Sequence, residues 1–490
     1  MSSERASVFV TSRYNFHVPV DDGVLLYSAN TGAVLRFNGS DGLALARTLS
    51  AKRLEVPENS LPPEIQKQLH AGGFIVADDK DELVEISERF HRARKETPLV
   101  LTLTTTMDCN LGCYYCYEER APDRLELKDV AAVVALVKDK LARSGKRSLH
   151  VDWYGGEPLM NVEFIEAAST ALQSLCKRQE VAYVASIISN GTCWPNEVAS
   201  FINRHCIRQV QISFDGLRAN HDRRRHYRKG YAPDSDASSF DRAVRLVDSL
   251  LDHVRVDIRI NIDRPNRADV IPFIRFARSL GWFQRSFPAV IQPARLSSYS
   301  EHSAFMRESE LSLEEYDEIR RLVRSEVGTE APVEESEAPD GFPYPKTSVC
   351  AALANDSIVV GADGRQYHCG LQAAEPQRAV GNIRERSKRQ LPVMGSPERQ
   401  LPVMGLPGDN RPSEESWWQG FDPTILPTCS RCSFLPICWG GCPKKHLERD
   451  DHAIAEQSRY WRMNLPRLIS SGVNAKAPPD FVFGEADQFR

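Results

Sequence analysis

The sequence predicts an α/β fold built around a parallel sheet. Between residues 99 and 292, short β-rich runs alternate six times with helical patterns. Alternation of strand and helix is typical of parallel sheets. At 490 residues the chain is also long enough for several domains and a large buried core. In such folds the chemistry gathers at the carboxyl ends of the strands, so the segments after each strand are the first place to look for a site.

The expected elements follow from these runs. The strands are expected at 99–105, 149–154, 182–189, 209–215, 255–261 and 287–292. Helical patterns lie between them at 127–144, 161–178, 195–204, 239–251 and 267–280, and a further helix is expected at 312–327.

Composition narrows the classes of function. The formal net charge is -4 and no basic block occurs, which argues against nucleic acid as a partner. No apolar run approaches the roughly 18 residues that span a bilayer, and residues 1–6 lack a signal-peptide pattern. We therefore expect a cytoplasmic protein with no membrane partner. Twelve cysteines in such a protein point to metal binding rather than to disulfides.

Residues 1–94 are expected to form a separate small domain. Three short apolar runs, at 16–20, 24–27 and 33–37, are interrupted by turn sequences and predict a three-stranded meander. One helix is expected to start near Ser40-Asp41 as its N-cap. A second should follow Pro62-Pro63 and end at Gly72-Gly73, and a third should run from about residue 81 to 94.

A cysteine loop directly follows the first expected strand of the core. Cys109, Cys113 and Cys116 have the spacing Cys-x3-Cys-x2-Cys. Three thiolates on a short loop can hold three irons of a 4Fe-4S cluster and leave the fourth iron open to a ligand. A zinc loop is the alternative, although zinc sites usually have four ligands in paired units and no partner pair lies close by in sequence.

With Tyr115 before its last cysteine, this loop resembles the signature of the radical S-adenosylmethionine (SAM) superfamily. The six strand-helix units resemble the partial (β/α)6 TIM barrel of that superfamily, and Gly155-Gly156-Glu157-Pro158 resembles its GGEP motif. The resemblance implies a 4Fe-4S cluster on the three cysteines. It also implies a SAM site with these contacts: Tyr115, Gly155, Gly156, Glu157, Pro158, Ser189, Ser213 and Arg225.

The resemblance also suggests how these residues would be used. Tyr115 would lie against the adenine, the GGEP segment would meet the amino group of SAM, and Ser213 would face its ribose or methionine. Arg225 would pair with the carboxylate, because a guanidinium offers two parallel hydrogen bonds. Arg223 and Arg224 are alternatives for that contact, and a solvated basic loop is another interpretation of the run.

A second cysteine pattern occupies the last third of the chain. Cys350, Gly364-x4-Cys369 on an expected hairpin at 362–364, and Cys429-x2-Cys432-x5-Cys438-x3-Cys442 resemble the SPASM extension of radical SAM enzymes. The resemblance implies one auxiliary iron-sulfur cluster on Cys350, Cys369 and Cys442. A second would use Cys429, Cys432 and Cys438. A tetracysteine zinc site is the alternative for residues 429–442.

The sequence departs from that family pattern in one respect. No cysteine follows Cys442, so the last SPASM ligand is absent. His446, Asp450, Asp451 or His452 could replace it, water or substrate could occupy the position, or the second cluster could be missing or of another type.

The motifs divide the chain into expected domains. Residues 95–327 form the radical SAM core, 328–346 a linker, 347–460 the SPASM domain with an insertion at 384–425, and 461–490 a C-terminal tail. The insertion holds a tandem duplication, 389–395 and 399–405, and is expected to be a disordered loop. Residues 1–94 resemble the winged-helix-like RiPP recognition element (RRE), to which a precursor leader would add as a strand. A structural cap on the barrel is the alternative.

The resemblance implies a radical SAM/SPASM peptide maturase. Its cluster would reduce SAM to a 5'-deoxyadenosyl radical that abstracts hydrogen, crosslinking or oxidising side chains of a ribosomally made precursor peptide (RiPP). A flavodoxin or ferredoxin would supply electrons. One alternative is a sulfatase-maturing, formylglycine-forming enzyme, although those enzymes usually carry an aspartate where this chain has Gly370. The other is a non-catalytic, metal-stabilised peptide-binding scaffold.

Overall fold

The computed structural model describes residues 8–21, 23–57, 60–116, 118, 120–232, 237–298, 301–328, 342–373, 375–385, 413–474 and 482–483. These residues fall into two compact units. The first draws on Met1–Glu96, Glu335–Val349 and Phe421–Arg490, and the second on Thr97–Glu334 and Cys350–Gly420. The units divide the chain differently from the expected domains, whose functions stay predictions. The central part of the expected linker, 329–341, and the tandem duplication lie outside the described residues.

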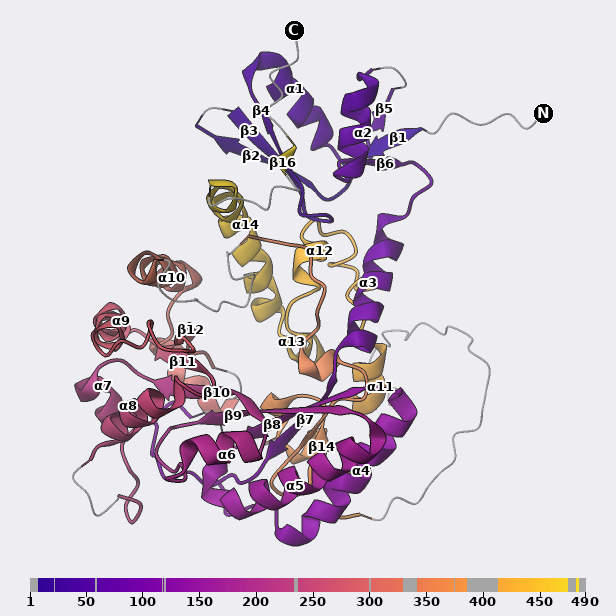
Figure 1. Cartoon of the computed structure of the whole chain (residues 1–490). Coiled ribbons are helices and arrows are strands. Elements are labelled where there is room, and N and C mark those ends of the chain that lie inside the picture. Colours follow the sequence, from indigo (N-terminus) through magenta and orange to yellow (C-terminus); the bar gives the residue numbers. More distant parts are fainter. Residues whose placement is uncertain are drawn as a thin grey trace. The chain divides into compact units, whose positions relative to one another are not determined.

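The second unit is organised by a mostly parallel sheet, which confirms the predicted α/β core (Figure 1). The winged-helix-like and SPASM parts of the predicted fold stay predictions. Its six parallel strands are β7 (Leu99–Thr104), β8 (Ser148–Tyr154), β9 (Ala182–Ser189), β10 (Ile207–Phe214), β11 (Arg255–Ile262) and β12 (Val290–Arg295). They pair in chain order, so their carboxyl ends meet along one edge.

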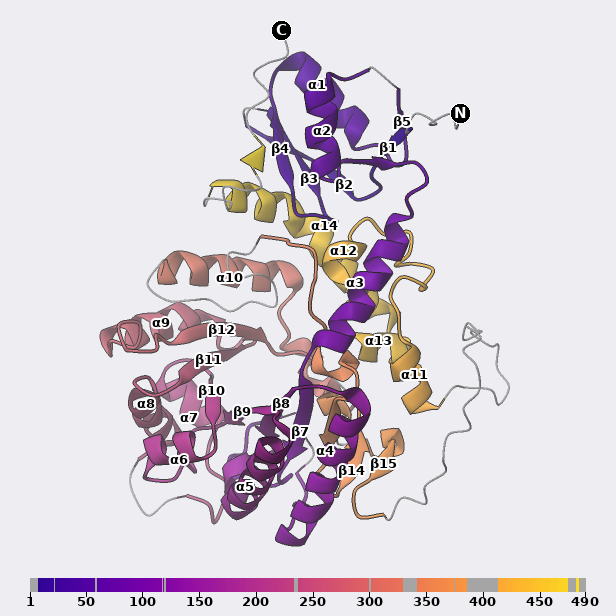
Figure 2. The same ribbon diagram turned by 45° about the vertical axis from the view of Figure 1, so that its right-hand side comes forward.

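Helices cover one face of this sheet (Figure 2). They are α4 (Val130–Ser144), α5 (Val162–Gln179), α6 (Val198–Arg204), α7 (Arg218–Arg224), α8 (Ser239–Leu250), α9 (Val270–Ser279) and α10 (Leu313–Val327), with short 3-10 turns beside several of them. Apolar side chains alternate along the strands, and Trp153, Ile187 and Phe214 are completely buried in the core beneath the helices. Burying side chains of this size is the main favourable term that holds the strands in register.

A hairpin extends the sheet beyond β7. It consists of β13 (Ile358–Val360) and β14 (Arg365–Tyr367), and β15 (Gly381–Asn382) pairs with β14. The predicted turn at 362–364 is confirmed, and Gly364 has φ of +84°, a value that favours glycine. The sequence did not predict that β13 runs parallel to β7, which brings Cys369 to the sheet of the core.

The core differs from the prediction at one strand and one helix. The sixth strand begins at Val290 rather than at residue 287, and Phe287 is 44% exposed in the turn before it. Helix α7 was not predicted, because its sequence Arg-Ala-Asn-His-Asp-Arg-Arg has no apolar stripe. This helix places Arg224 and Arg225 beside the end of β10.

The first unit contains two sheets. One has the order β16-β4-β3-β2 and includes the predicted meander: β2 (Asn15–Val20), β3 (Gly23–Ser28) and β4 (Val34–Phe37), with β16 (Val482–Phe483) parallel to β4. The other has the order β5-β1-β6 and was not predicted: β1 (Phe9–Thr11), β5 (Glu55–Val56) and β6 (Ile75–Ala77).

The three predicted helices of this unit are present as α1 (Gly39–Leu49), α2 (Pro63–Ala71) and α3 (Glu82–Glu96). The predicted N-cap of α1 is wrong: Asn38 precedes the helix, and its side chain makes no capping hydrogen bond. Helix α3 packs on the C-terminal part of the unit, where the ring centroids of Phe90 and Trp439 lie 5.3 Å apart and His91 lies 2.9 Å from Asp422.

The helices of the C-terminal part are α11 (Glu414–Gly420), which belongs to the second unit, and α12 (Leu435–Cys438), α13 (Pro443–Glu448) and α14 (Asp451–Asn474), which belong to the first. Helix α14 runs through the expected boundary at residue 460. Among the described residues, no helix has the length and apolar character needed to cross a membrane.

Candidate active site

The cysteine loop after β7 is fixed at both ends by the segment that follows α7. The Gly112 N–H donates to the His226 carbonyl at 2.8 Å, and the Arg228 N–H donates to the Asn110 carbonyl at 2.9 Å. Asp108 accepts hydrogen bonds from Arg228 and from the Tyr231 hydroxyl at 2.6 Å. Burial opposes ionisation of Asp108, but these bonds outweigh it and lower its pKa. These hydrogen bonds therefore fix the shape of the loop.

The three thiols of this loop lie close enough to influence one another. Burial, followed by the Glu157 charge, raises the pKa of Cys109 strongly, and both Cys113 and Cys116 add to the increase. Burial raises the pKa of Cys116 to about 11 and also raises that of Cys113. Within the described residues, no three His, Cys, Asp or Glu side chains are grouped closely enough for a single metal ion.

The Gly-Gly-Glu-Pro segment after β8 packs directly on the cysteine loop. The Gly156 N–H donates to the Thr106 carbonyl and the Glu157 N–H to the Asp108 carbonyl, both at 3.0 Å. A Cβ at Gly156 would lie 2.4 Å from the Asp108 oxygen, and one at Gly155 would lie 2.3 Å from the Thr106 oxygen. Glycine is thus required at both positions because the backbone of this segment approaches the backbone of the cysteine loop so closely.

Glu157 is completely buried and ties this segment to the end of β9. Its carboxylate accepts hydrogen bonds from the Ser189 hydroxyl at 2.9 Å, the Asn190 N–H at 2.7 Å and the Leu159 N–H at 3.2 Å. Burial raises the pKa of Glu157 to about 7. Pro158 takes part through its carbonyl, which accepts from the Thr105 hydroxyl at 3.0 Å.

Asn190 connects the same strand end to the cysteines. Its amide donates to Asn110 Oδ1 at 2.8 Å and approaches Cys109 Sγ at 3.7 Å. The sequence offered Asn190 only as part of a strand end. No local pattern indicates a contact across 80 residues, so this role could not be predicted.

Tyr115 is the centre of a buried polar cluster. Its hydroxyl donates to Asp215 Oδ1 at 2.6 Å and accepts from Arg225 at 2.6 Å and from the Asn261 amide at 3.3 Å. Arg224 bonds Asp215 on the other side at 2.7 Å and Asp263 at 2.9 Å. The cluster therefore joins the cysteine loop to the carboxyl ends of β10 and β11.

The three neighbouring arginines differ in their surroundings. Arg223 is exposed and bonds Asn220. Arg224 bonds two carboxylates, and its Nη2 is a buried donor with no hydrogen-bond partner among the described residues. Arg225 is 6% exposed, and its Nε is a buried donor with no hydrogen-bond partner among the described residues. An unpartnered buried guanidinium N–H is costly, so Arg225 is well suited to an anionic ligand.

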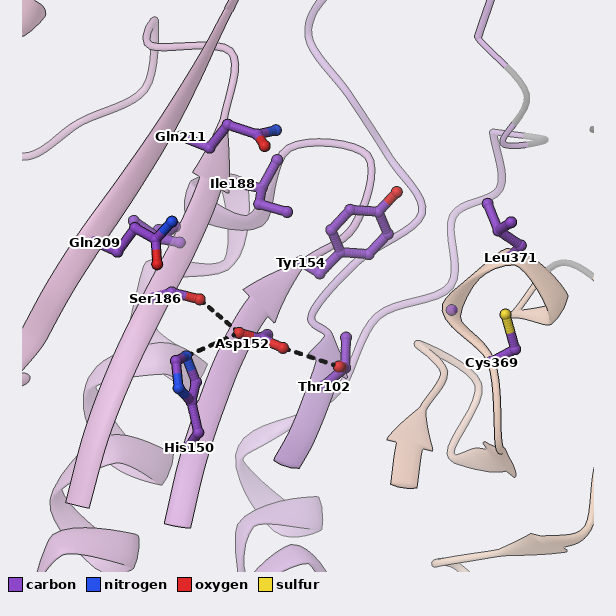
Figure 3. A pocket seen from close by; sticks show the side chains of 12 residues that line it. Thr102, His150, Asp152, Tyr154, Ser186, Ile188, Gln209, Gln211, Cys369 and Leu371 are labelled. Carbon is purple, nitrogen blue, oxygen red and sulfur yellow. Dashed lines mark hydrogen bonds and ion pairs between the residues drawn. The ribbon is translucent and has the colours of Figure 1, made fainter. Parts of the chain in front are cut away.

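A cavity of about 410 Å³ opens on the sheet face opposite the helices (Figure 3). Its lining residues are Thr102, His150, Asp152, Tyr154, Ser186, Ile187, Ile188, Gln209, Gln211, Cys369, Gly370 and Leu371. Tyr154 directly precedes the two glycines, so the cavity adjoins the Gly-Gly-Glu-Pro segment. Ser213 is buried two residues beyond Gln211 on the same face of β10.

The cysteines of the C-terminal pattern fall in both units. Cys350 and Cys369 belong to the second unit and Cys442 to the first, so their predicted grouping stays a prediction. Cys429, Cys432 and Cys438 all belong to the first unit. Burial raises the pKa of Cys438 to about 11, and Cys429 and Cys432 add to that increase.

Comparison with known proteins identifies the core. Residues 103–277 match the Radical SAM superfamily. The chain therefore contains a radical SAM domain. The domain includes the cysteine loop, the Gly-Gly-Glu-Pro segment and Arg225. Radical SAM domains use SAM and a 4Fe-4S cluster, and the residues here fit both groups. Three thiols lie on one loop, and the buried Nε–H of Arg225 can donate to the carboxylate of SAM.

Two named maturation proteins are similar in sequence to this chain. The sporulation killing factor maturation protein SkfB of Bacillus subtilis is 26% identical over 201 residues, which are 41% of this chain and 46% of SkfB. The serine-type anaerobic sulfatase-maturating enzyme of Klebsiella pneumoniae is 22% identical over 348 residues, which are 68% of this chain and 79% of the enzyme. The match thus spans less than half the length of SkfB.

A solved structure shares the fold. The structure of anSMEcpe with bound AdoMet and Cp18Cys peptide is 17% identical, with a TM-score of 0.54, and the match covers 78% of this chain and 100% of that one. At this identity the likeness concerns the fold alone.

Proposed function

We propose that this protein is a radical SAM maturase that crosslinks or oxidises side chains of a ribosomally made precursor peptide. The observation that carries the proposal is the contact between the cysteine loop and the Gly-Gly-Glu-Pro segment beside a cavity. That arrangement supplies a cluster loop, a cofactor segment and room for a substrate side chain at one edge of a parallel sheet.

Different residues of the core would hold the cluster and SAM. Cys109, Cys113 and Cys116 would hold the 4Fe-4S cluster, and Arg225 would hold the carboxylate of SAM through its free Nε–H. Tyr115 would keep Arg225 in place and present its ring to the ligand. Glu157 orders Gly155 and Gly156, whose backbone would face the cofactor. SAM and the reduced cluster, when bound, would supply the radical that abstracts hydrogen from the peptide.

The remaining cysteines would hold auxiliary iron-sulfur clusters. Cys350, Cys369 and Cys442 would serve the first, and Cys429, Cys432 and Cys438 the second. Cys369 lines the cavity, so a cluster there would stand beside the substrate and could accept its electron. Electrons for the reaction would come from a flavodoxin or ferredoxin.

The N-terminal sheet would bind the leader of the precursor. Strand β2 is a terminal strand of the sheet β16-β4-β3-β2, and the opposite end is taken by β16 of the same chain. An extended leader could add to β2 through backbone hydrogen bonds, although Pro19 in that strand lacks one donor. The similarity to a killing-factor maturation protein supports a peptide of this class.

Sulfatase maturation is the second candidate. The Klebsiella relative matches over 68% of this chain, which favours it. Gly370 lies at the position where an aspartate is usual in those enzymes. A Cβ there would meet no atom within 4 Å, so packing does not explain the absence of a side chain.

Coexpression with two sets of peptides separates these functions. One set comprises the short peptides encoded beside the gene, and the other comprises serine- and cysteine-containing sulfatase peptides. The proposal predicts loss of two hydrogens from a short encoded peptide, seen by mass spectrometry, without an aldehyde that reacts with hydrazine. An aldehyde on the sulfatase peptide would instead identify a sulfatase-maturing enzyme, and two unmodified sets would favour the scaffold.

A further inference from the structure

Among the described residues that line this cavity, Asp152 is the only Asp or Glu. It accepts hydrogen bonds from the Ser186 hydroxyl at 2.5 Å and the Thr102 hydroxyl at 3.3 Å, and it lies 3.1 Å from His150 Nε2. Figure 3 shows these three contacts converging on the carboxylate at the centre of the strands. The Asp152 side chain is still 28% exposed, so its oxygens can accept further bonds.

The neighbours of Asp152 form a row across four strands. Thr102, Asp152, Ser186 and Gln209 are register partners on β7, β8, β9 and β10. The row lies two residues before the carboxyl ends marked by Thr104 and Tyr154, on the side of the cofactor segment. A substrate side chain that enters the cavity from that edge would contact the row with its terminal group.

Three of the four side-chain donors of this row are already in use. Ser186 and Thr102 give their hydroxyl hydrogens to Asp152, and the Gln209 amide donates to Asp257. Apart from the second hydrogen of the Gln209 amide, the atoms that remain are acceptors: the Asp152 oxygens, the two hydroxyl oxygens and the Gln209 carbonyl oxygen. An acceptor-rich site suits a group that only donates, and ammonium and guanidinium are the side-chain groups of that kind.

The rest of the lining agrees with such a ligand. No Lys or Arg is among the described residues that line the cavity. Tyr154, Ile188 and Leu371 supply apolar surface at the wall, against which the aliphatic stem of a lysine or arginine could pack.

We propose that this row is a specificity subsite that takes a lysine or arginine side chain of the substrate peptide, with Asp152 as its counter-ion. The inference rests on the proposed function and narrows its substrate class. It assigns Asp152 to binding and positioning, not to the radical chemistry.

Peptide probes of defined sequence test the subsite without requiring turnover. The probes are Ac-Gly-Gly-Xaa-Gly-Gly-NH2 with Xaa as lysine, arginine, norleucine, glutamine or glutamate. Binding to the anaerobically reconstituted full chain is measured by saturation-transfer NMR. We expect lysine and arginine probes to bind at least about tenfold more tightly than norleucine, since a charge-assisted hydrogen bond is lost in the latter. Equal binding of lysine and norleucine, tighter binding of glutamine or glutamate, or binding of no probe would overturn the proposal.

Two variants locate the effect. Asp152→Asn keeps the shape of the side chain and should abolish the preference for lysine. Asp139→Asn, on the exposed face of α4, removes the same charge elsewhere and should leave the preference intact. Retention of the preference in Asp152→Asn would contradict the assignment. If Asp152→Asn does not fold, the comparison of probes on the unaltered chain still decides.

The same preparation separates this proposal from the proposed function. The 5'-deoxyadenosine formed under reducing conditions reports the radical SAM activity. Probe selectivity without SAM cleavage would support the subsite and contradict the maturase function. SAM cleavage without probe selectivity would support the radical SAM activity and contradict the subsite.

Discussion

The Tyr115 hydroxyl donates a hydrogen bond to Asp215 at 2.6 Å, which ties the cysteine loop to the end of β10, 100 residues away. Asp215 is completely buried and also holds Arg224 at 2.7 Å. A buried carboxylate is stable only when its partners satisfy it, so this contact sets the position of the loop as well as that of the arginines.

Tyr115→Phe should therefore weaken the fold and the cofactor site together. Removing the hydroxyl leaves Asp215, Arg225 and Asn261 each short of a buried partner, at a cost of about 1 to 3 kcal/mol. Urea unfolding measures the loss. Tyr316→Phe is the control, since its hydroxyl donates to the Pro293 carbonyl at 2.8 Å in a part-buried setting, and it should cost less. Equal stability of Tyr115→Phe and the unaltered protein would show that the cluster does not hold the loop.

Gly156→Ala should displace the cysteine loop. The added Cβ would lie 2.4 Å from the Asp108 oxygen, so one backbone must move, and overpacking of this kind typically costs about 1 to 3 kcal/mol. We expect a lower melting temperature and less iron bound after reconstitution. Gly420→Ala is the matched control, because its Cβ would meet nothing within 4 Å. An unchanged iron content in Gly156→Ala would refute the coupling between the two segments.

We propose that His446 completes the second auxiliary site, in which case its Nε2 would exchange the Gly440 carbonyl oxygen, 2.7 Å away, for the cluster. A Cβ at Gly440 would lie 3.5 Å from Cys429 Sγ and 3.6 Å from His446 Nε2, so the thiol and the imidazole flank the same glycine. Imidazole replaces thiolate at some iron-sulfur clusters. His446→Ala should therefore lower the iron content and alter the electron paramagnetic resonance of the auxiliary clusters. His452→Ala serves as the control, and iron loss in that variant alone would exclude His446.

Glu326 should stabilise the packing of α10 on α9 in a pH-dependent manner. Hydrogen bonds from Arg275 and Arg278 lower its pKa to about 2, from an ordinary value of 4.5. Because the folded state holds the ionised form, the stabilisation is present above the ordinary pKa and is lost as the pH falls toward 2.

Glu326→Gln should lower stability near neutral pH by on the order of 1 kcal/mol. The gap from the unaltered protein should narrow as the pH falls below the ordinary pKa, as followed by urea unfolding of the metal-free chain. Glu318→Gln, an exposed change on the same helix, should show no such gap. A gap that widens in acid would reverse the assigned sign.

The strands of the core could be predicted because each has a local signature. β8, for example, alternates buried Leu149, Val151 and Trp153 with side chains that face the cavity. The cysteine loop and the Gly-Gly-Glu-Pro segment could also be predicted, because the order and spacing of their residues are sufficient to recognise them. The sixth strand was predicted to begin three residues too early, because the aromatic Phe287 is typical of a strand but lies in the preceding turn.

The contacts that shape the site could not be predicted in this way. Asp215 bonds Tyr115, Asn190 bonds Asn110, and β13 joins β7 across about 260 residues of sequence. Each depends on how distant segments meet, and no periodicity or spacing encodes such a meeting. The cavity around Asp152 belongs to the same class, because its row exists only after four strands align.

The most direct test of the central claim is anaerobic reconstitution followed by a SAM cleavage assay with dithionite. The protein is compared with the Cys109/Cys113/Cys116→Ala variant and with a Cys176/Cys206→Ala control, whose cysteines lie outside the proposed ligand sets. The account predicts that the unaltered protein and the control form 5'-deoxyadenosine. The triple variant should lack the iron of the radical SAM cluster, keep the iron of the auxiliary clusters and form no 5'-deoxyadenosine. Zinc in place of iron, or iron without 5'-deoxyadenosine, in the unaltered protein would contradict it.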